Sequence, residues 1–201
     1  MTAHPIELCG VAVTVETCPH YLSFAAEEIA AGDTRLKCAP PIRSREDQET
    51  LWRALRDGEI DLIATDHSPA PAALKHIDDG DFVAAWGGIA SLQLGLAAVW
   101  TAARGRGVDP AMVARWMCHA PAGLAGLAAR KGELREGADA DVVIWNPDAE
   151  VDVDASRLYH RHPVSPYDGR RLRGRVVTTL VRGTVVYDAG AVIADPVGML
   201  L

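Results

Sequence analysis

The sequence predicts an α/β unit followed by a smaller all-β unit, and three observations support this prediction. Segments rich in β-branched residues alternate with amphipathic segments through the first two thirds of the chain, which is typical of parallel βαβ units. After Lys131 the sequence becomes rich in turn residues and short β-branched runs. With 49% hydrophobic and 23% charged residues, the composition is that of a folded globular chain. We expect the two units to span residues 1–130 and 131–201.

The run Val11–Glu16 predicts a buried strand that ends before Pro19, because proline cannot donate to a strand ladder. A helix is expected over 23–31, with a serine as its N-cap and a glycine as its stop. A short extended piece over 35–41 follows it.

A second helix is predicted over 44–57, with Ser44 as its N-cap. Asp47 stands three residues after the cap, as in a capping box, and two leucines four residues apart form one apolar stripe. The next predicted strand is Ile60–Asp66, which leads into a loop rich in proline and alanine.

Three helices are predicted in the following segment. The pair Gly87-Gly88 is expected to open a helix that runs to Gly105. Asp109 is the predicted N-cap of the next helix, with proline at the first helical position, and a short third helix is expected over 121–129.

The C-terminal unit is predicted to contain strands over 141–145, 175–181 and 184–187, with a hairpin turn at Arg182-Gly183. The N-terminal unit offers only three candidates for parallel strands, whereas a closed β/α barrel needs about 200 residues or more. The α/β unit is therefore either a small open sheet or the C-terminal portion of a larger barrel.

Two side chains with metal-binding chemistry stand at the ends of predicted parallel strands. His20 follows the first strand and Asp66 ends the last one, and functional groups of parallel sheets gather at the carboxyl ends of strands. An imidazole and a carboxylate there can hold a metal ion, and the carboxylate can act as a general base. Taken singly, His20 is also compatible with a structural histidine and Asp66-His67 with a solvated turn. Two ligands are too few for a catalytic zinc ion.

Two other polar segments are weaker candidates for a binding site. Trp86-Gly87-Gly88 can present backbone N–H groups to an anion or a carbonyl group, or can form a tight turn with a packed indole. The stretch from His160 to Arg175 is basic, and because the rest of the chain is acidic we expect a solvated or subunit-contacting surface there.

The composition excludes some partners and locations. The formal net charge of -7, from 20 Lys+Arg against 27 Asp+Glu, argues against nucleic acid or an anionic membrane as the main partner. No apolar run is long enough to span a membrane, and the first residues lack the regions of a signal peptide. The 4 cysteines form no CxxC motif and are expected to be reduced thiols of a cytoplasmic protein.

Several stretches resemble the cyclic amidohydrolases, the group of dihydroorotases, hydantoinases and allantoinases. The stretches shared with the whole group are ETCPHYL (16–22), KCAPPIR (37–43), DLIATDHSP (61–69) and the turn-rich segment that begins at Gly132. Within the group, AWGGIASLQ (85–93) and RHPVSPYDG (161–169) resemble the allantoinases most, since hydantoinases typically carry Asn-Gly in place of Trp86-Gly87. The resemblance runs from about Val11 to about Asp188.

This resemblance implies a (β/α)8 TIM-type barrel, of which the chain would carry strands six to eight with their helices, and part of a small β-sandwich. It implies a binuclear centre, usually of zinc, bridged by hydroxide and by a carboxylated lysine. The implied reaction is hydrolysis of the cyclic amide bond of allantoin to allantoate. The implied partners are a small cyclic ureide as substrate and further copies of the chain, since family members are commonly tetramers.

The resemblance also implies roles for individual residues. His20 would be the metal ligand after strand six, and Asp66 after strand eight would be both a metal ligand and the catalytic acid–base group. His67 would support these ligands without binding the metal. The residues implied to contact the substrate are Ala39, Trp86, Gly87 and Gly88.

The chain departs from the family pattern in its metal ligands. The His-x-His motif after the first strand, the lysine that becomes carboxylated and the histidine of strand five are absent. The chain thus resembles the C-terminal half of an allantoinase, and we expect weak or no activity from it alone. Two alternatives remain: a hydantoinase or dihydropyrimidinase acting on another ring, and a non-catalytic fragment that associates with a complementary chain through its open sheet edges.

Overall fold

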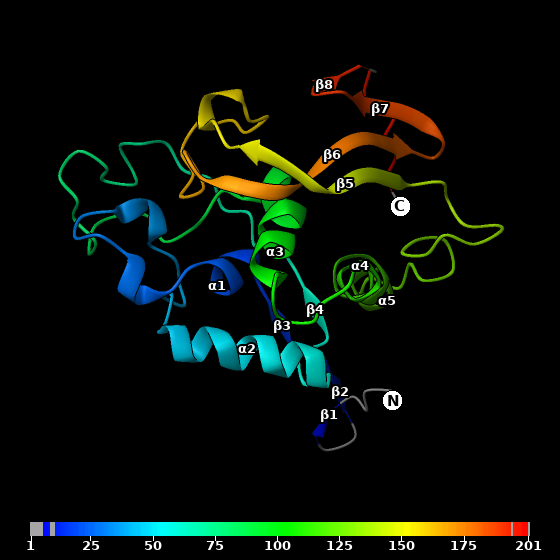
Figure 1. Ribbon diagram of the computed structural model, residues 1–201, viewed down its shortest axis with the longest axis horizontal. Helices are drawn as coiled ribbons and strands as arrows, with labels where there is room; N and C mark the ends of the chain where they lie inside the picture. The colour runs from blue at the N-terminus through cyan, green and yellow to red at the C-terminus, as the bar shows by residue number, and fades with distance from the viewer. Residues whose placement is uncertain (1–5, 9–10, 194, 201) are drawn as a thin grey trace.

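The computed structural model describes residues 6–8, 11–193 and 195–200 and arranges them in layers (Figure 1). A four-stranded antiparallel sheet lies on one side of helix α3 (Gly95–Ala103), and helix α2 (Arg45–Asp57) lies on the other. Within these described residues, no helix is long and apolar enough to cross a membrane.

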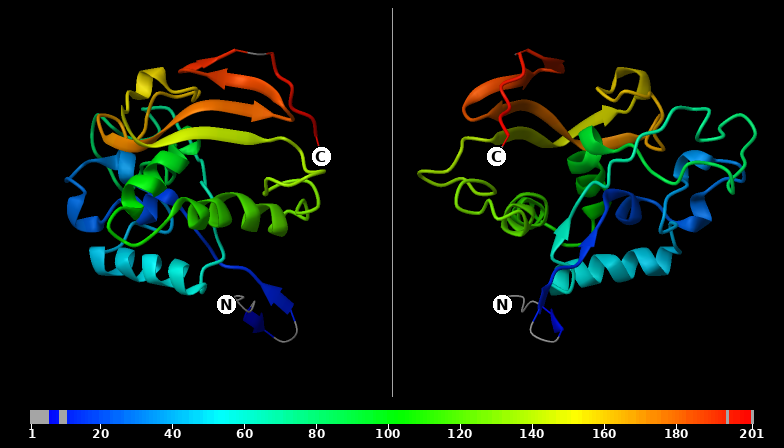
Figure 2. Two further views of the ribbon diagram at one scale, coloured as in Figure 1. Left: turned by 45° about the vertical axis from the view of Figure 1, so that its right-hand side comes forward. Right: turned by 180° about the vertical axis from the view of Figure 1, so that it is seen from behind.

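Two short parallel strands lie at the centre of the N-terminal unit (Figure 2). Strand β3 (Glu16–Thr17) pairs with β4 (Leu62–Ile63), and the pairing continues through a hydrogen bond from the Ala64 N–H to the Thr17 carbonyl. The expected parallel arrangement is confirmed for these strands, although both are shorter than predicted. The piece over 35–41 is not a strand, and its beginning belongs to the 3-10 turn η2 (Thr34–Leu36).

The segments before and after β3 differ from the prediction. A separate antiparallel hairpin of β1 (Ile6–Leu8) and β2 (Val11–Val13) takes the first half of the predicted strand. The helix predicted over 23–31 is wrong, because a five-residue helix, α1 (Pro19–Ser23), precedes it and only the 3-10 turn η1 (Ala26–Glu28) follows. The proline at the first position of α1 explains this early start, since its fixed φ favours helix initiation.

Helix α2 begins and ends where the sequence predicts. Ser44 and Asp47 form a reciprocal capping box at its start. The indole N–H of buried Trp52 donates to the Leu22 carbonyl at 3.2 Å. Helix α2 therefore holds α1 in place, and α1 is the helix that carries His20.

The next two helices only partly match the prediction. The helix expected from Gly87 begins at Gly95, after the 3-10 turn η3 (Leu92–Leu94), so the Gly87-Gly88 pair lies in the preceding loop. Asp109 caps α4 (Pro110–Ala114) through the Met112 N–H, as predicted.

Helix α4 continues through a π-helical turn, η4 (Arg115–His119), into α5 (Ala120–Leu124). The third predicted helix is therefore the end of this continuous run, and it stops five residues earlier than expected.

The C-terminal sheet has the order β5-β6-β7-β8 and is antiparallel throughout. Its strands are β5 (Val142–Asp152), β6 (Arg171–Val181), β7 (Thr184–Asp188) and β8 (Ala191–Val192), and the 3-10 turn η5 (Ala155–Arg157) follows β5. The three predicted strands are confirmed, although β5 and β6 are longer than expected. Arg182 and Gly183 both have positive φ, at 47° and 80°, which is the geometry of the predicted hairpin turn.

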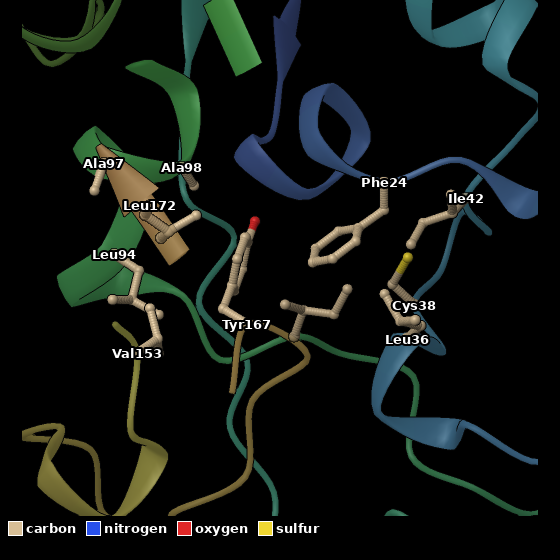
Figure 3. Packing of buried hydrophobic residues seen from close by; sticks show 11 residues of the cluster. Phe24, Leu36, Cys38, Ile42, Leu94, Ala97, Ala98, Val153, Tyr167 and Leu172 are labelled. Carbon is tan, nitrogen blue, oxygen red and sulfur yellow. The ribbon is translucent and has the colours of Figure 1, made fainter. Parts of the chain in front are cut away.

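The sheet and the helical part share one hydrophobic core cluster (Figure 3). Phe24 and Cys38 of the N-terminal unit pack in it together with Tyr167 and Leu172 of the C-terminal unit. The Phe24 and Tyr167 rings lie 4.8 Å apart. The division at residue 130 thus marks a change of secondary structure, while the packing continues across it.

A buried lysine holds the long loop between β4 and α3. Lys75 is 2% exposed, and its Nζ donates to the carbonyl oxygens of Lys37 at 3.0 Å, Trp86 at 3.1 Å and Gly88 at 2.8 Å. These bonds use all three donors of an ammonium group. Burial lowers the pKa of Lys75 to about 8, so the group is mostly charged at neutral pH. Lys75 therefore joins the Trp86–Gly88 segment to the segment around Lys37.

Replacing Lys75→Met should destabilise the chain by about 3 kcal/mol or more, because three buried carbonyl groups lose a charged donor. Lys37→Met is the matched control, since the exposed Lys37 Nζ donates only to the Val83 carbonyl, and its loss should cost less than about 1 kcal/mol. Urea denaturation of both variants measures the difference. Equal losses would show that the buried contacts of Lys75 do not hold the loop.

The two neighbouring glycines of this loop should respond differently to alanine. A Cβ on Gly88 would lie 2.4 Å from Ser68 Oγ and 2.8 Å from the Ser68 carbonyl oxygen, whereas a Cβ on Gly87 would meet its nearest neighbour, Ala39 Cβ, at 3.7 Å. We expect Gly88→Ala to lower the free energy of unfolding by about 1–3 kcal/mol and Gly87→Ala to change it little. Thermal denaturation of the two variants tests this, and an unchanged Gly88→Ala midpoint would contradict it.

Candidate metal centre

His20 is fully buried, and neither of its ring nitrogens has a hydrogen-bond partner among the described residues. It is the second residue of α1 and lies just beyond the carboxyl end of β3. Burial lowers the pKa of His20 to about 4, against a smaller opposing effect of Asp66, so the ring is neutral at neutral pH. Buried polar groups are rarely left without partners, and a neutral imidazole is a common metal ligand.

Asp66 lies three residues beyond the end of β4, on the same edge as His20. Its side chain is exposed, and its backbone has a φ of 44°, in the left-handed region. Residues with a side chain seldom adopt this conformation, and such strained positions cluster at functional sites.

A third possible ligand, Cys18, completes a compact cluster. One ligand atom from each of Cys18, His20 and Asp66 lies within 4.8 Å of the others. Burial, and to a smaller extent the charge of Asp66, raise the pKa of the Cys18 thiol to about 12, so the thiol is protonated in the absence of a metal. A thiol, an imidazole and a carboxylate are all ligand types of zinc, so the donor set fits a metal ion. Sequence reasoning assigned Cys18 no role, although it stands two residues before His20 in the same stretch.

His67 links the strand end to the start of the next helical segment. Its Nδ1 accepts hydrogen bonds from the backbone N–H groups of Ser91 and Leu92, both at 3.1 Å. Burial lowers the pKa of His67. Nδ1 is therefore the acceptor, and Nε2 carries the proton. Through these two bonds the His67 ring anchors its own backbone, which directly follows Asp66, to the Ser91–Leu92 segment.

His160 is a partly buried residue whose contact with His67 sequence reasoning missed. Its ring lies 4.8 Å from that of His67, and both its nitrogens are buried without a hydrogen-bond partner in the described parts of the chain. The expectation of a solvated surface is wrong for this residue. The expectation of a solvated surface holds for Arg171, which is largely exposed. Its Nε lies 2.7 Å from an Asp152 carboxylate oxygen on β5.

The four residues expected to contact substrate lie together beside the Asp66 segment: Ala39, Trp86, Gly87 and Gly88. The Trp86 indole is 48% exposed and donates to Ser68 Oγ at 3.2 Å, and Ser68 is two residues beyond Asp66. The Gly88 N–H donates to the Lys37 carbonyl at 3.1 Å, so this group is used within the fold. A role as a helix N-terminus is wrong for both glycines, since α3 begins at Gly95.

Two surface cavities lie elsewhere on the molecule. One, of about 300 Å³, is lined by residues that include Ser23, Thr101 and Tyr167, and the other includes Tyr21 and Leu51. His20 and Asp66 line neither cavity, so the candidate centre is defined by its ligand geometry.

The curated proteins with similar sequences include allantoinases. The chain is 50% identical over 193 residues to the allantoinase of Arabidopsis thaliana, covering 95% of this chain and 38% of that protein. It is 48% identical over 192 residues to the allantoinase of Streptomyces avermitilis, covering 96% of this chain and 42% of that protein. The chain therefore spans about two fifths of the length of these curated relatives.

Solved structures agree with the fold. The L-hydantoinase (dihydropyrimidinase) from Arthrobacter aurescens matches with a TM-score of 0.85 and 34% identity, covering 90% of this chain and 41% of that chain. The D-hydantoinase (dihydropyrimidinase) from Thermus sp. matches with a TM-score of 0.81 and 28% identity, covering 92% of this chain and 42% of that one.

The family model described as the amidohydrolase family matches residues 7–186, which is most of the chain. This match agrees with the family stretches around His20 and Asp66. It also agrees with the pairing of β3 and β4, the strands that precede these two residues. The chain belongs to the amidohydrolase family.

Proposed function

We propose that this chain carries part of the active site of an allantoinase-like cyclic amidohydrolase. The reaction would be the metal-dependent hydrolysis of the cyclic amide bond of allantoin to allantoate. One observation carries the proposal: a buried, neutral His20 with two unpartnered ring nitrogens stands beside Asp66, at the ends of two directly paired strands. The allantoinase relatives support the choice of substrate.

The residues would divide the chemistry between them. A zinc ion bound here would polarise the ring carbonyl and lower the pKa of the attacking water. His20 would hold the metal through a ring nitrogen. Asp66 would bind the metal, accept a proton from the water and pass it to the ring nitrogen that leaves. His67 would keep the Asp66 segment in place through its two backbone hydrogen bonds.

The loop residues would contact the ring. The half-exposed indole of Trp86 offers an apolar wall, and the neighbouring Gly87 and Ala39 are small enough for a ring to approach the backbone. The Gly88 N–H already donates to the Lys37 carbonyl, so it would not bind the ring directly. We assign Gly88 the role of holding the backbone conformation of this loop.

The wider setting of the enzyme is also a proposal. We propose zinc as the metal and a homo-oligomer, a tetramer as in the family, as the assembly. We propose the cytoplasm as the location. Cys18, Cys38 and Cys118 are free thiols, in keeping with a reducing compartment, while Cys9 lies outside the described residues.

A hydantoinase or dihydropyrimidinase activity is the second candidate. The structural match to the L-hydantoinase from Arthrobacter aurescens favours it. The Trp86-Gly87 pair favours allantoin, since hydantoinases typically carry Asn-Gly there.

Zinc should stabilise the chain through His20 and Asp66. At a free zinc concentration about 100 times the Kd, we expect a gain of about 2.7 kcal/mol in the free energy of unfolding, because zinc binds the folded state. His20→Ala and Asp66→Asn should each remove most of this gain. His119→Ala is the matched control, since His119 is exposed and lies on η4. Denaturant unfolding with and without zinc measures the gain, and an equal gain in His20→Ala would rule out this site.

The zinc-loaded chain should prefer allantoin over hydantoin and dihydrouracil. We expect weak turnover, with kcat/KM at least about tenfold higher for allantoin, because the loop contacts suit its ureide. Asp66→Asn should lower this turnover by about 10²–10⁴-fold through loss of the proton acceptor. Asp148→Asn, at an exposed carboxylate on β5, should leave it unchanged. Steady-state assays and calorimetric binding of the three rings decide between the candidates, and equal values would remove the choice of allantoin.

A further inference from the structure

Lys75 is a buried cation that the proposed chemistry does not use. Lysine is among the residue types that are least often fully buried, and a buried charge is costly unless hydrogen bonds satisfy it. The Lys75 ammonium group meets this condition with backbone alone, since it donates to the carbonyl oxygens of Lys37, Trp86 and Gly88. The purpose of this residue is therefore to be sought in the backbone that it holds.

The three acceptors belong to the two segments that carry the proposed ring contacts. Lys37 stands two residues before Ala39, and the other two acceptors are the ends of the Trp86–Gly88 segment. The two segments face each other, since a Cβ on Gly87 would lie 3.7 Å from the Ala39 Cβ. The Lys75 nitrogen therefore sets the separation of the two surfaces that a ring would touch.

The strand ends that carry the candidate metal ligands are held by other contacts. Strands β3 and β4 pair directly with each other. Beyond β4, His67 forms a parallel bridge with Ile89, and the Ser68 N–H donates to the Ile89 carbonyl at 3.0 Å. We therefore expect the loss of Lys75 to shift the ring-contacting segments and to leave the strand ends in place.

We propose that Lys75 is a positioning residue for the substrate, which holds Ala39 and the Trp86–Gly88 segment at the separation that admits the ring of a cyclic ureide. Lys75 is 2% exposed, so it acts through the backbone and does not touch the ring. This inference rests on the proposed function and adds to it the residue that shapes the ring-binding surface.

The shape of the side chain matters as well as its charge. An ammonium group directs three N–H bonds from one atom toward acceptors on different sides, whereas a guanidinium group presents its donors in one plane. Arginine at position 75 would keep the positive charge without placing donors at the same three carbonyl oxygens. A role that depended on charge alone would be restored by arginine, whereas a positioning role would not.

Substrate affinity and kinetics of the zinc-loaded chain test the positioning role. We expect Lys75→Met and Lys75→Arg each to raise KM and the calorimetric Kd for allantoin by about tenfold or more. The kcat should change by less than about threefold, because the displaced surface binds the ring and does not carry out the chemistry.

Lys131→Met is the matched control for these measurements. It also removes an ammonium group with several partners, here the carboxylates of Asp139 and Asp141 in the C-terminal unit. Its KM and Kd for allantoin should stay within about twofold of those of the unchanged chain, since it lies outside the ring-contacting segments.

Hydrogen exchange in the absence of substrate and metal gives a second readout. The Gly88 N–H donates at 3.1 Å to the Lys37 carbonyl, one of the groups that Lys75 holds. We expect the Gly88 amide to exchange about tenfold faster or more in Lys75→Arg, while the amides of α2 keep their rates. Lys75→Arg also decides the matter if Lys75→Met does not fold, as judged by circular dichroism.

The outcomes separate this inference from the proposed function. An unchanged KM and Kd in both Lys75 variants would overturn the positioning role and leave the proposed function standing. Equal acceleration of exchange at Gly88 and in α2 would show that Lys75 only stabilises the fold, and would also overturn the inference. No binding of allantoin, hydantoin or dihydrouracil by the unchanged zinc-loaded chain would overturn the proposed function and the inference with it.

Discussion

The candidate centre depends on one short parallel pairing, between β3 and β4. Its four residues bring together two stretches that are far apart in the sequence, and the carboxyl ends of parallel strands lie at the same edge. His20 follows one strand and Asp66 follows the other, so their proximity is a consequence of this register. Helix α2 connects the two strands and also packs on α1, which fixes the direction in which His20 leaves the strand.

The same arrangement has a cost that a bound cation would offset. A buried imidazole without a hydrogen bond destabilises a fold by about 1–3 kcal/mol. The packing of α1 against α2 and α3 opposes this penalty. The neighbouring loop is organised by side chains that bond to the backbone: Lys75 through three carbonyl groups and His67 through two N–H groups. A loop without regular secondary structure is thereby held against a rigid strand end, a common setting for functional residues.

Local patterns predicted the features whose causes are local. The Ser44 cap of α2, the Asp109 cap of α4 and the turn at Arg182-Gly183 were predictable, because each depends on residues a few positions apart. The helix expected over 23–31 fails although its composition favours a helix, since α1 has already formed just before it and the segment only makes a 3-10 turn. Strands of two residues leave no periodic pattern, so β3 and β4 could not be bounded from sequence.

The sequence by itself determined the family stretches, and through them it singled out His20 and Asp66 as candidate metal ligands. It also determined the change from helices to strands near residue 130. Only the tertiary structure decided that Cys18 faces these two residues and that His160 packs on His67. The physical reason is that such contacts join segments separated by tens of residues. Strand register and helix packing set their distances, and these depend on the whole core and not on neighbouring residues.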